Sequence, residues 1–417
     1  MSAHLTDRTA HGLAPDGAGR VRTPSGRTIS AAAARRVHDA TPANTERART
    51  SRTDLFTAWC REHGRIGTDP GTVPDYAAHL ADLGYRAETV ETYAGALAAN
   101  LAVSGHPLDD EDRAYIRAIV NSRAAEESRD ESGAGDVLQA SPITRADLAA
   151  MIATRGRDVA GIRDRLALCL HWYMAGRASE PASLSIRDVR EVVAELLDEK
   201  TGELLRVPAL EVTLRRSKIN PHGRSVDVIR ILSQHDDTCP VRWYRAWSAV
   251  LAAAEVISGP LLRRVRNNKL TTAGRPPGDK SRAGGIGDRK IRNLIAECAL
   301  AARLAEPLSD DERAVLSTKA EREDLAQLPD DAAVREAFRA ERRHARRELR
   351  RRRPRHSGHS MRRGCVRHLQ QQGTPRHLIE THCRYTAGSR ALARYLDETI
   401  PWADNPTRPR RQAAAGV

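Results

Sequence analysis

Residues 359–364 read HSMRRG and carry His359 three positions before Arg362. Three positions are close to one helical turn, so both side chains share a face if this stretch is a helix. A second stretch, SRALARYLDET at 389–399, carries Tyr395, which stands 33 positions after Arg362. One histidine and one arginine occur together often by chance. Their meaning therefore depends on partners elsewhere in the chain.

The composition favours a partner of negative charge. The chain has 417 residues, a formal net charge of +14 and a pI near 10.0. This length suits two or three domains. Aromatic residues make up only 4%, so the core must be built mainly from Ala, Leu and Val. A strongly basic balance points to a polyanion, and nucleic acid is the first candidate. Genome base composition also raises Arg, so charge alone does not decide.

The six cysteines form no C-x-x-C pair, which argues against a zinc ribbon or a disulfide framework. Cys365 and His368 stand near His382 and Cys383, but their spacing fits no common metal pattern. No apolar run reaches membrane length, and the N-terminus shows no signal-peptide core. We expect a protein of the reducing cytoplasm, associated with the nucleoid and not with a membrane.

Shifts in composition divide the chain into five parts. Residues 1–44 are rich in Ala, Gly, Thr, Pro and Arg and are expected to form a disordered basic arm. Residues 45–130 show four short helical patterns, which predict a small helical domain. A polar, Gly-containing linker at 131–142 leads to a second domain at 143–402. A disordered tail is expected at 403–417.

Local signals refine this division. The first helical pattern predicts an apolar face formed by Leu55, Phe56, Trp59 and Cys60. Thr144, with Asp147 three residues later, is the expected N-cap of the first helix in the second domain. Residues 205–232 alternate in polarity around the turn signal NPHG at 220–223 and predict an antiparallel β-hairpin. The expected fold is mainly α-helical with a small antiparallel sheet.

Residues 307–350 have the character of an insertion. Their first half is acidic and helical, and the run RRHARRELRRRRPR at 342–355 is intensely basic. A charge run is usually a solvated face, and here it equally fits contact with DNA phosphates. The candidate phosphate contacts are Arg350, Arg351, Arg352, Arg353 and Arg363.

Two further stretches supply the partners of HSMRRG. AGRASEPASL at 175–184 carries Arg177 and Glu180, and RRSKINPHGR at 215–224 carries Lys218. Together with His359, Arg362 and Tyr395, these residues resemble the tyrosine recombinase (phage integrase) family. The active site of that family reads Arg, Lys, His-x-x-Arg, His or Trp, and Tyr in the same chain order. The resemblance covers about residues 45–402, apart from the insertion.

The resemblance implies a role for each residue. Arg177 and Arg362 would hold the charge that develops on the phosphate oxygens, for which guanidinium forks are suited. Lys218 would protonate the leaving 5′-oxygen. His359 would accept a proton or a hydrogen bond. Tyr395 would attack phosphorus and form a 3′-phosphotyrosine. Glu180 is expected to support Arg177.

The second His or Trp position of the family is not filled by either residue. It usually lies nine or ten residues before the nucleophile, where this chain has Tyr385. We expect the phenol of Tyr385 to donate to a phosphate oxygen, with His382 as the alternative. Pro181 also departs from the family, in which Leu is more usual, although Pro is tolerated in a first helical turn.

The resemblance also implies an architecture and partners. A helical, SAM-like core-binding domain and an α+β catalytic domain would clamp double-stranded DNA as two lobes, and a homotetramer would assemble on the DNA. The chemistry would need no metal, ATP or other cofactor. Two alternatives stay open: a type IB topoisomerase-like or telomere-resolving enzyme with the same chemistry, and a DNA-binding protein with a decayed site.

Overall fold

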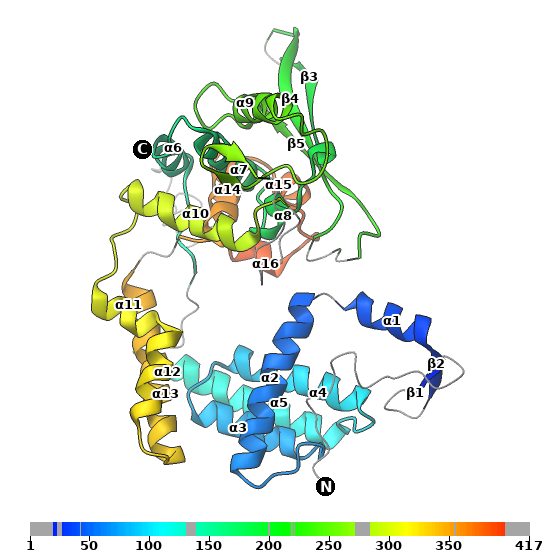
Figure 1. Cartoon of the computed structure of the whole chain (residues 1–417), viewed down its shortest axis with the longest axis vertical. Helices are drawn as coiled ribbons and strands as arrows, with labels where there is room; N and C mark the ends of the chain where they lie inside the picture. Colours follow the sequence, from blue (N-terminus) through cyan, green and yellow to red (C-terminus); the bar gives the residue numbers. More distant parts are fainter. Residues whose placement is uncertain are drawn as a thin grey trace, which may run out of the picture. The chain divides into compact units, whose positions relative to one another are not determined.

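The computed structural model describes residues 20–22, 27–41, 43–130, 139–198, 201–217, 220, 222–271, 284–353 and 356–396. Over these residues the chain is mainly helical with small antiparallel sheets, which confirms the expected fold class at this level. The chain forms two compact units (Figure 1): residues 1–138 with 308–352, and residues 139–307 with 353–417. Within the described ranges, no helix is long and apolar enough to cross a membrane.

The first unit combines the N-terminal helices with the inserted ones. Its helices are α1 (Ala31–Ala40), α2 (Ala43–Glu62), α3 (Thr72–Asp82), α4 (Ala87–Val103), α5 (Asp110–Arg129), α11 (Asp310–Leu316), α12 (Thr318–Gln327) and α13 (Ala332–Arg352). Two short strands, β1 (Arg20–Arg22) and β2 (Thr28–Ser30), pair antiparallel. The described part of the expected arm at 1–44 therefore carries secondary structure, because its alanine run favours helix α1.

Aromatic rings form the centre of this unit. The rings of Phe56 and Trp59 on α2 lie 5.2 Å and 5.1 Å from that of Tyr76 on α3. All three side chains are buried, as is Cys60. Leu55, which the sequence places on the same apolar face, is instead 49% exposed. One residue rotates a helix by about 100°, so Leu55 and Phe56 cannot both point into one narrow core.

Short polar signals set the helix ends. Asp109 and Asp112 form a capping box at the start of α5. Thr144 and Asp147 form another at the start of α6 (Arg145–Ala153), as the sequence predicts. Gly84, two residues after α3, has a φ of +74°. This left-handed conformation is typical of the glycine that ends a helix. These ends fix where each helix stops and the next can turn back to pack.

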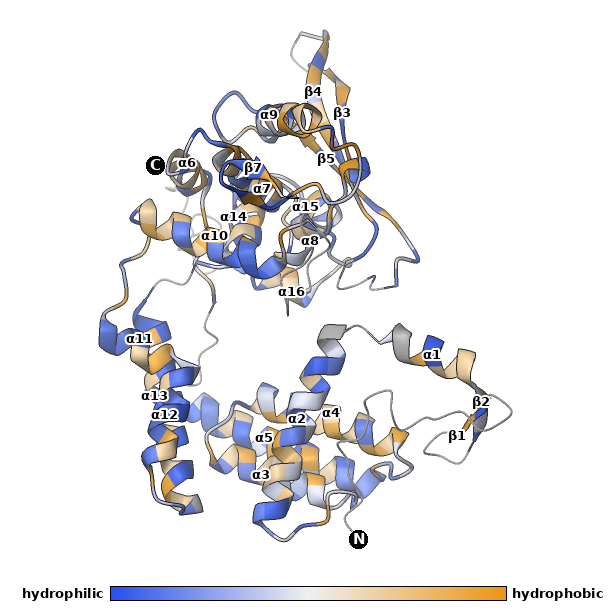
Figure 2. Ribbon diagram, in the orientation of Figure 1, coloured by the Kyte–Doolittle hydropathy of each residue, from blue (hydrophilic) through white to orange (hydrophobic). Residues whose placement is uncertain are grey.

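The inserted helices pack on the N-terminal ones. The Arg343 side chain on α13 donates to the Leu83 carbonyl at 2.6 Å and lies over the Tyr85 ring at 4.6 Å. Glu336 on the same helix pairs with His79 on α3 at 3.3 Å. Figure 2 shows α13 as a mostly hydrophilic helix interrupted by a few hydrophobic residues. The segment at 307–350 thus belongs, from Leu308 on, to the unit that contains the N-terminal helices.

The second unit packs further helices around a three-stranded sheet. Besides α6, its helices are α7 (Val159–Tyr173), α8 (Ser179–Ser183), α9 (Pro240–Ala253), α10 (Asp288–Ala301), α14 (Gly358–Gln371), α15 (Arg376–Cys383) and α16 (Arg390–Ala393), with a 3₁₀ turn at Ile186–Asp188. Its strands are β3 (Val189–Leu197), β4 (Leu204–Leu214) and β5 (Asp227–Leu232), and the short pair β6 (Val265–Arg266) and β7 (Lys269–Leu270).

The predicted hairpin is present, and the sheet contains one more strand. β4 and β5 pair antiparallel, with Thr213 opposite Val228, and β3 pairs with the other edge of β4. Pairing with β5 stops at Ala209, whereas pairing with β3 continues to Leu204. The far half of β3 and β4 is therefore a two-stranded ribbon, on which Leu204 is 59% exposed.

Helix α14 crosses the core at a position where only glycine fits. A Cβ at Gly364 would lie 1.7 Å from the Ile143 carbonyl oxygen and 3.0 Å from Trp172 Nε1. The same carbonyl accepts a hydrogen bond from Trp172 Nε1 at 2.8 Å, and the Ile143 N–H donates to the Ser360 carbonyl at 3.0 Å. This close approach sets α14 against α7.

We therefore expect Gly364→Ala to lower the free energy of unfolding by about 3 kcal/mol or more, because the methyl group must displace a backbone carbonyl. Gly95→Ala is the matched control, since a Cβ at Gly95 in α4 meets nothing within 4 Å. That change should raise stability by about 0.5–1 kcal/mol through helix propensity. Urea unfolding followed by circular dichroism measures both. Equal stability of Gly364→Ala and the parent chain would contradict the packing described for α14.

Candidate active site

The start of α14 positions two of the expected residues. Ser357 and Ser360 form a capping box that begins the helix. His359 and Arg362 then follow one turn apart, as their spacing predicts. The His359 side chain is exposed, whereas Arg362 is only 2% exposed. One helix thus carries a surface imidazole and a buried guanidinium.

Arg362 holds three segments together. Its Nε donates to the Tyr385 hydroxyl at 2.7 Å. Its two terminal nitrogens donate to the carbonyls of Ala175, just after α7, at 2.6 Å and of Cys383, at the end of α15, at 2.7 Å. The guanidinium also lies over the Tyr385 ring at 4.3 Å. These bonds compensate a buried charge and fix the position of Tyr385.

Arg177 is held by a buried carboxylate. Glu180, which is 2% exposed, accepts from the Arg177 side chain at 3.2 Å and from its backbone N–H at 3.1 Å. The same carboxylate accepts from Arg384 at 2.6 Å. The Arg177 side chain remains 25% exposed. Glu180 therefore positions one arginine at the surface and a second in the interior.

Tyr395 and His359 face each other. The Tyr395 hydroxyl lies 3.2 Å from His359 Nδ1, and the Tyr395 backbone N–H donates to the Leu392 carbonyl at 2.7 Å. The rings of Tyr385 and Tyr395 are 6.3 Å apart. Burial raises the pKa of Tyr385, although the nearby Arg362 opposes this effect. Tyr385 is thus a protonated, half-buried phenol beside the more accessible pair.

The structure brings together five of the six residues expected from the sequence. Arg362 donates a hydrogen bond to Tyr385, and the Tyr395 hydroxyl lies within hydrogen-bond distance of His359. Arg177 is connected to this group through Glu180, which also accepts from Arg384, the residue before Tyr385. The sixth, Lys218, lies outside the described residues. His382, the alternative to Tyr385, has its Nε2 at 2.7 Å from the Tyr173 carbonyl, so its ring is directed to the end of α7.

The candidate phosphate contacts are divided between the two units. Arg350, Arg351 and Arg352 end α13 in the first unit, where Arg351 pairs with Glu348 at 2.9 Å. Arg353 pairs with Glu306 at 2.7 Å. Arg363 donates to the Ala140 carbonyl at 3.0 Å. Arg351, Arg353 and Arg363 each have a partner within the protein in this structure.

Sequence reasoning missed two neighbours of the site. Arg384 stands in left-handed conformation, with a φ of +58°, and donates to the Met174 carbonyl as well as to Glu180. His171 is fully buried on α7, and its Nε2 lies 3.1 Å from the Gly176 carbonyl. Neither residue has a local pattern around it. The one available signal was a lone histidine in the apolar run LALCLHWYM.

Comparison with known proteins gives a distant likeness. No family model matches the chain, and no curated protein matches it. Among solved structures, the chain is similar to the Tn1549 transposon integrase in complex with circular intermediate DNA. The identity is 12%, the match covers 88% of this chain and 94% of that one, and the TM-score is 0.41. For a complex of that integrase with transposon right end DNA, the identity is 12%, the match covers 87% of this chain and 95% of that one, and the TM-score is 0.40. Likeness this low does not carry an activity from one protein to another.

His171 gives a testable pH dependence of stability. Burial lowers its pKa from 6.5 to about 4. Between pH 6.5 and pH 4, His171 is mostly protonated in the unfolded chain and mostly neutral in the folded chain. The stability of the folded chain is therefore unaffected by this residue above about pH 6.5, and it decreases as the pH falls toward 4. We expect a loss of roughly 3 kcal/mol from this residue.

Urea unfolding at pH 7 and pH 4.5 checks this expectation. His171→Gln should lose less stability between the two pH values than the parent chain does. Because the other titratable groups are shared by both proteins, the difference isolates His171. Identical losses would show that burial does not lower the pKa of His171 in the folded chain.

Proposed function

We propose that this chain cuts and rejoins double-stranded DNA through a covalent 3′-phosphotyrosine formed on Tyr395. The observation that carries the proposal is the 3.2 Å contact between the Tyr395 hydroxyl and His359 Nδ1, on the helix that also bears Arg362. A phenol ordinarily has a pKa of about 10 and needs a base to lose its proton at neutral pH. An imidazole at this distance suits that task.

In the proposed step, the Tyr395 oxygen forms a bond to phosphorus while the bond from phosphorus to the 5′-oxygen breaks. The phenol proton passes to His359. We assign the proton for the leaving 5′-oxygen to Lys218 from the sequence resemblance. The phosphotyrosine conserves the energy of the broken bond, so rejoining is the reverse step and consumes no ATP. The roles of all these groups require no metal ion.

The arginines support this assignment by their chemistry. Attack on a phosphodiester adds negative charge to the non-bridging oxygens, and fixed guanidinium donors stabilise such charge well. Arg177 reaches the surface while its carboxylate partner holds it in place. Tyr385 accepts from Arg362, which leaves its own O–H as a donor for a phosphate oxygen. Arg177 and Tyr385 would contact the phosphate, and Arg362 would hold Tyr385 in place and add its charge close by.

The paired Tyr395 and His359 favour an active enzyme over a decayed DNA-binding protein. A type IB topoisomerase-like or telomere-resolving enzyme would share this chemistry and differ only in its products. We propose site-specific recombination, with four copies of the chain assembled on DNA, because the sequence resembles the tyrosine recombinases over most of its length. Analysis of the rejoined products separates exchange between two duplexes from relaxation of one.

Tyr395→Phe tests the nucleophile. The change removes the attacking oxygen and keeps the ring, so covalent DNA–protein adducts should disappear while DNA affinity changes less than about twofold. The substrate is a duplex selected from a random pool for binding to the chain and then nicked to trap the adduct. Denaturing gels detect the adduct.

Tyr385→Phe is the matched control. It removes the neighbouring hydroxyl and should slow adduct formation without abolishing it. Adducts that persist in Tyr395→Phe and vanish in Tyr385→Phe would identify Tyr385 as the nucleophile. If no variant and no parent chain form adducts on a bound duplex, the chain binds DNA without cutting it.

The basic end of α13 gives a separate prediction about binding. Replacing Arg350, Arg351, Arg352 and Arg353 with Gln should weaken binding to all duplexes alike. The slope of log affinity against log salt should flatten by about one unit per lost phosphate contact. Fluorescence anisotropy over a range of salt measures the slope, and preference for the selected duplex should survive.

An unchanged salt slope would contradict a phosphate-binding role for this segment. Acidic partners already neutralise part of α13, since Arg346 pairs with Glu321 at 2.8 Å and Arg342 with Asp324 at 3.0 Å. These pairs involve α12, and their arginines lie about one and two turns before Arg350. Arg342→Gln with Arg346→Gln is therefore a control, and it should alter stability more than the salt slope.

A further inference from the structure

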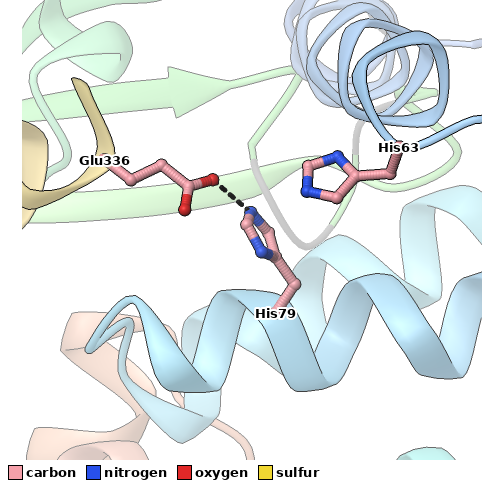
Figure 3. A group of neighbouring side chains, drawn as sticks. All are labelled: His63, His79 and Glu336. Carbon is pink, nitrogen blue, oxygen red and sulfur yellow. Dashed lines mark ion pairs between the residues drawn. The ribbon is translucent and has the colours of Figure 1, made fainter. Parts of the chain in front are cut away.

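Three side chains from separate helices meet in the first unit in a way that the proposed DNA chemistry does not use. His63 follows α2, His79 lies in the last turn of α3, and Glu336 lies on α13. Figure 3 shows the two imidazoles and the carboxylate pointing toward one another. One ligand atom from each lies within 4.8 Å of the others. His79 Nε2 and Glu336 Oε1 are 3.3 Å apart.

The His63 ring presents a nitrogen lone pair to this group. Its Nδ1 lies 3.0 Å from the Trp59 carbonyl oxygen. A carbonyl only accepts, so Nδ1 carries the hydrogen and Nε2 keeps the lone pair. A backbone carbonyl on the far ring nitrogen is also the contact that orients histidines bound to metals.

Aromatic neighbours hold both imidazoles in place. The Trp59 ring stacks on His63 with centroids 4.9 Å apart and lies 5.5 Å from the ring of His79. Tyr76 stacks on His79 at 6.0 Å. Little rotational freedom then remains to be lost when a ligand binds, which favours binding.

We propose that His63, His79 and Glu336 bind one divalent transition-metal ion of the zinc type. Two imidazoles and a carboxylate suit Zn²⁺ and similar ions, whereas Mg²⁺ and Ca²⁺ prefer oxygen ligands throughout. Tetrahedral bonds of about 2.0–2.1 Å place neighbouring ligand atoms about 3.3 Å apart. The His79–Glu336 pair already has this separation. The exposed side of His63 leaves room for water as the fourth ligand.

A simple ion pair between His79 and Glu336 does not account for His63. An ion pair requires a protonated His79, and a neighbouring imidazole contributes nothing to it. A metal ion would use the convergence of all three groups and would displace the proton that His79 Nε2 donates to Glu336.

The metal would join the insertion to the N-terminal helices. Glu336 lies on α13, whereas both histidines belong to the α2–α3 region, so a bound ion would link segments that are more than 250 positions apart in the sequence. Arg343 makes a second attachment on the same helix. The candidate active site lies in the other compact unit, so this inference does not depend on the proposed reaction.

The test uses the full chain without an affinity tag, stripped with a chelator and titrated with Zn²⁺ in a calorimeter. We expect one tight site per chain. His63→Gln should weaken it at least tenfold, and because this side chain is exposed, the variant should fold. Glu336→Gln should do the same. The matched controls are His106→Gln and Glu341→Gln, two exposed residues of the same unit, and both should bind like the parent.

A second measurement follows α13. Hydrogen exchange of its amides should slow several-fold when Zn²⁺ is added to the parent chain and should not change in Glu336→Gln. Failure to find a saturable site with one ion per chain would overturn the proposal. Equal affinity in the parent and in the His63→Gln, His79→Gln double variant would overturn it as well, by placing the metal on other residues. Binding without slower exchange in α13 would refute the link between the insertion and the N-terminal helices.

Discussion

A guanidinium that is almost wholly removed from water loses its hydration, and the protein must replace it with hydrogen bonds. Arg362 meets this requirement with two carbonyls and a phenol, which come from the turn after α7 and from the end of α15. The carbonyls of Ala175 and Cys383 end two different helices, where carbonyl groups lack helical partners. The charge therefore joins α14 to the ends of α7 and α15. Removing it would leave these acceptors buried and unsatisfied.

Glu180 extends the same principle by one step. A single buried carboxylate between Arg177 and Arg384 balances part of the positive charge around Arg362. Arg384 in turn bonds the carbonyl of Met174, beside the Ala175 carbonyl used by Arg362. Two arginines thus share the turn after α7. The charged groups of Arg362, Arg384 and Glu180 thus fix the turn that carries Arg177, in addition to apolar packing.

The sequence predicted features that rest on local chemistry. The Thr144 capping box and the pairing of β4 with β5 depend on residues close in sequence, and both are present in the structure. The His359 and Arg362 pair follows from helical spacing. Strand β3 was missed because its exposed face makes its pattern indistinct. Arg384 was missed because its role comes from contacts with Glu180, 204 positions away. No local pattern encodes a contact of that kind.

The insertion shows the same limit from another side. In the sequence, its basic run fits either a solvated face or contact with DNA phosphates. In the described part of the insertion, ion pairs between the acidic and basic halves join Glu321 with Arg346 and Asp324 with Arg342. Helical phase decides which charges meet, and total charge does not. The attachment of α13 to Leu83 and Tyr85 could not be read from charge at all.

The ribbon formed by the far halves of β3 and β4 bears on self-association. Beyond the end of β5, the edge of β4 is open, and exposed strand edges of this kind recruit other chains. Pro208 stands where the open edge begins. Its carbonyl accepts from the Ser233 N–H, and the N–H and C=O of a strand residue point to the same side, so the donor that proline lacks belongs to this edge. A foreign strand would meet a missing hydrogen bond at once, and the ring would obstruct its approach. One proline thus makes the open edge of β4 a poor template for a further strand.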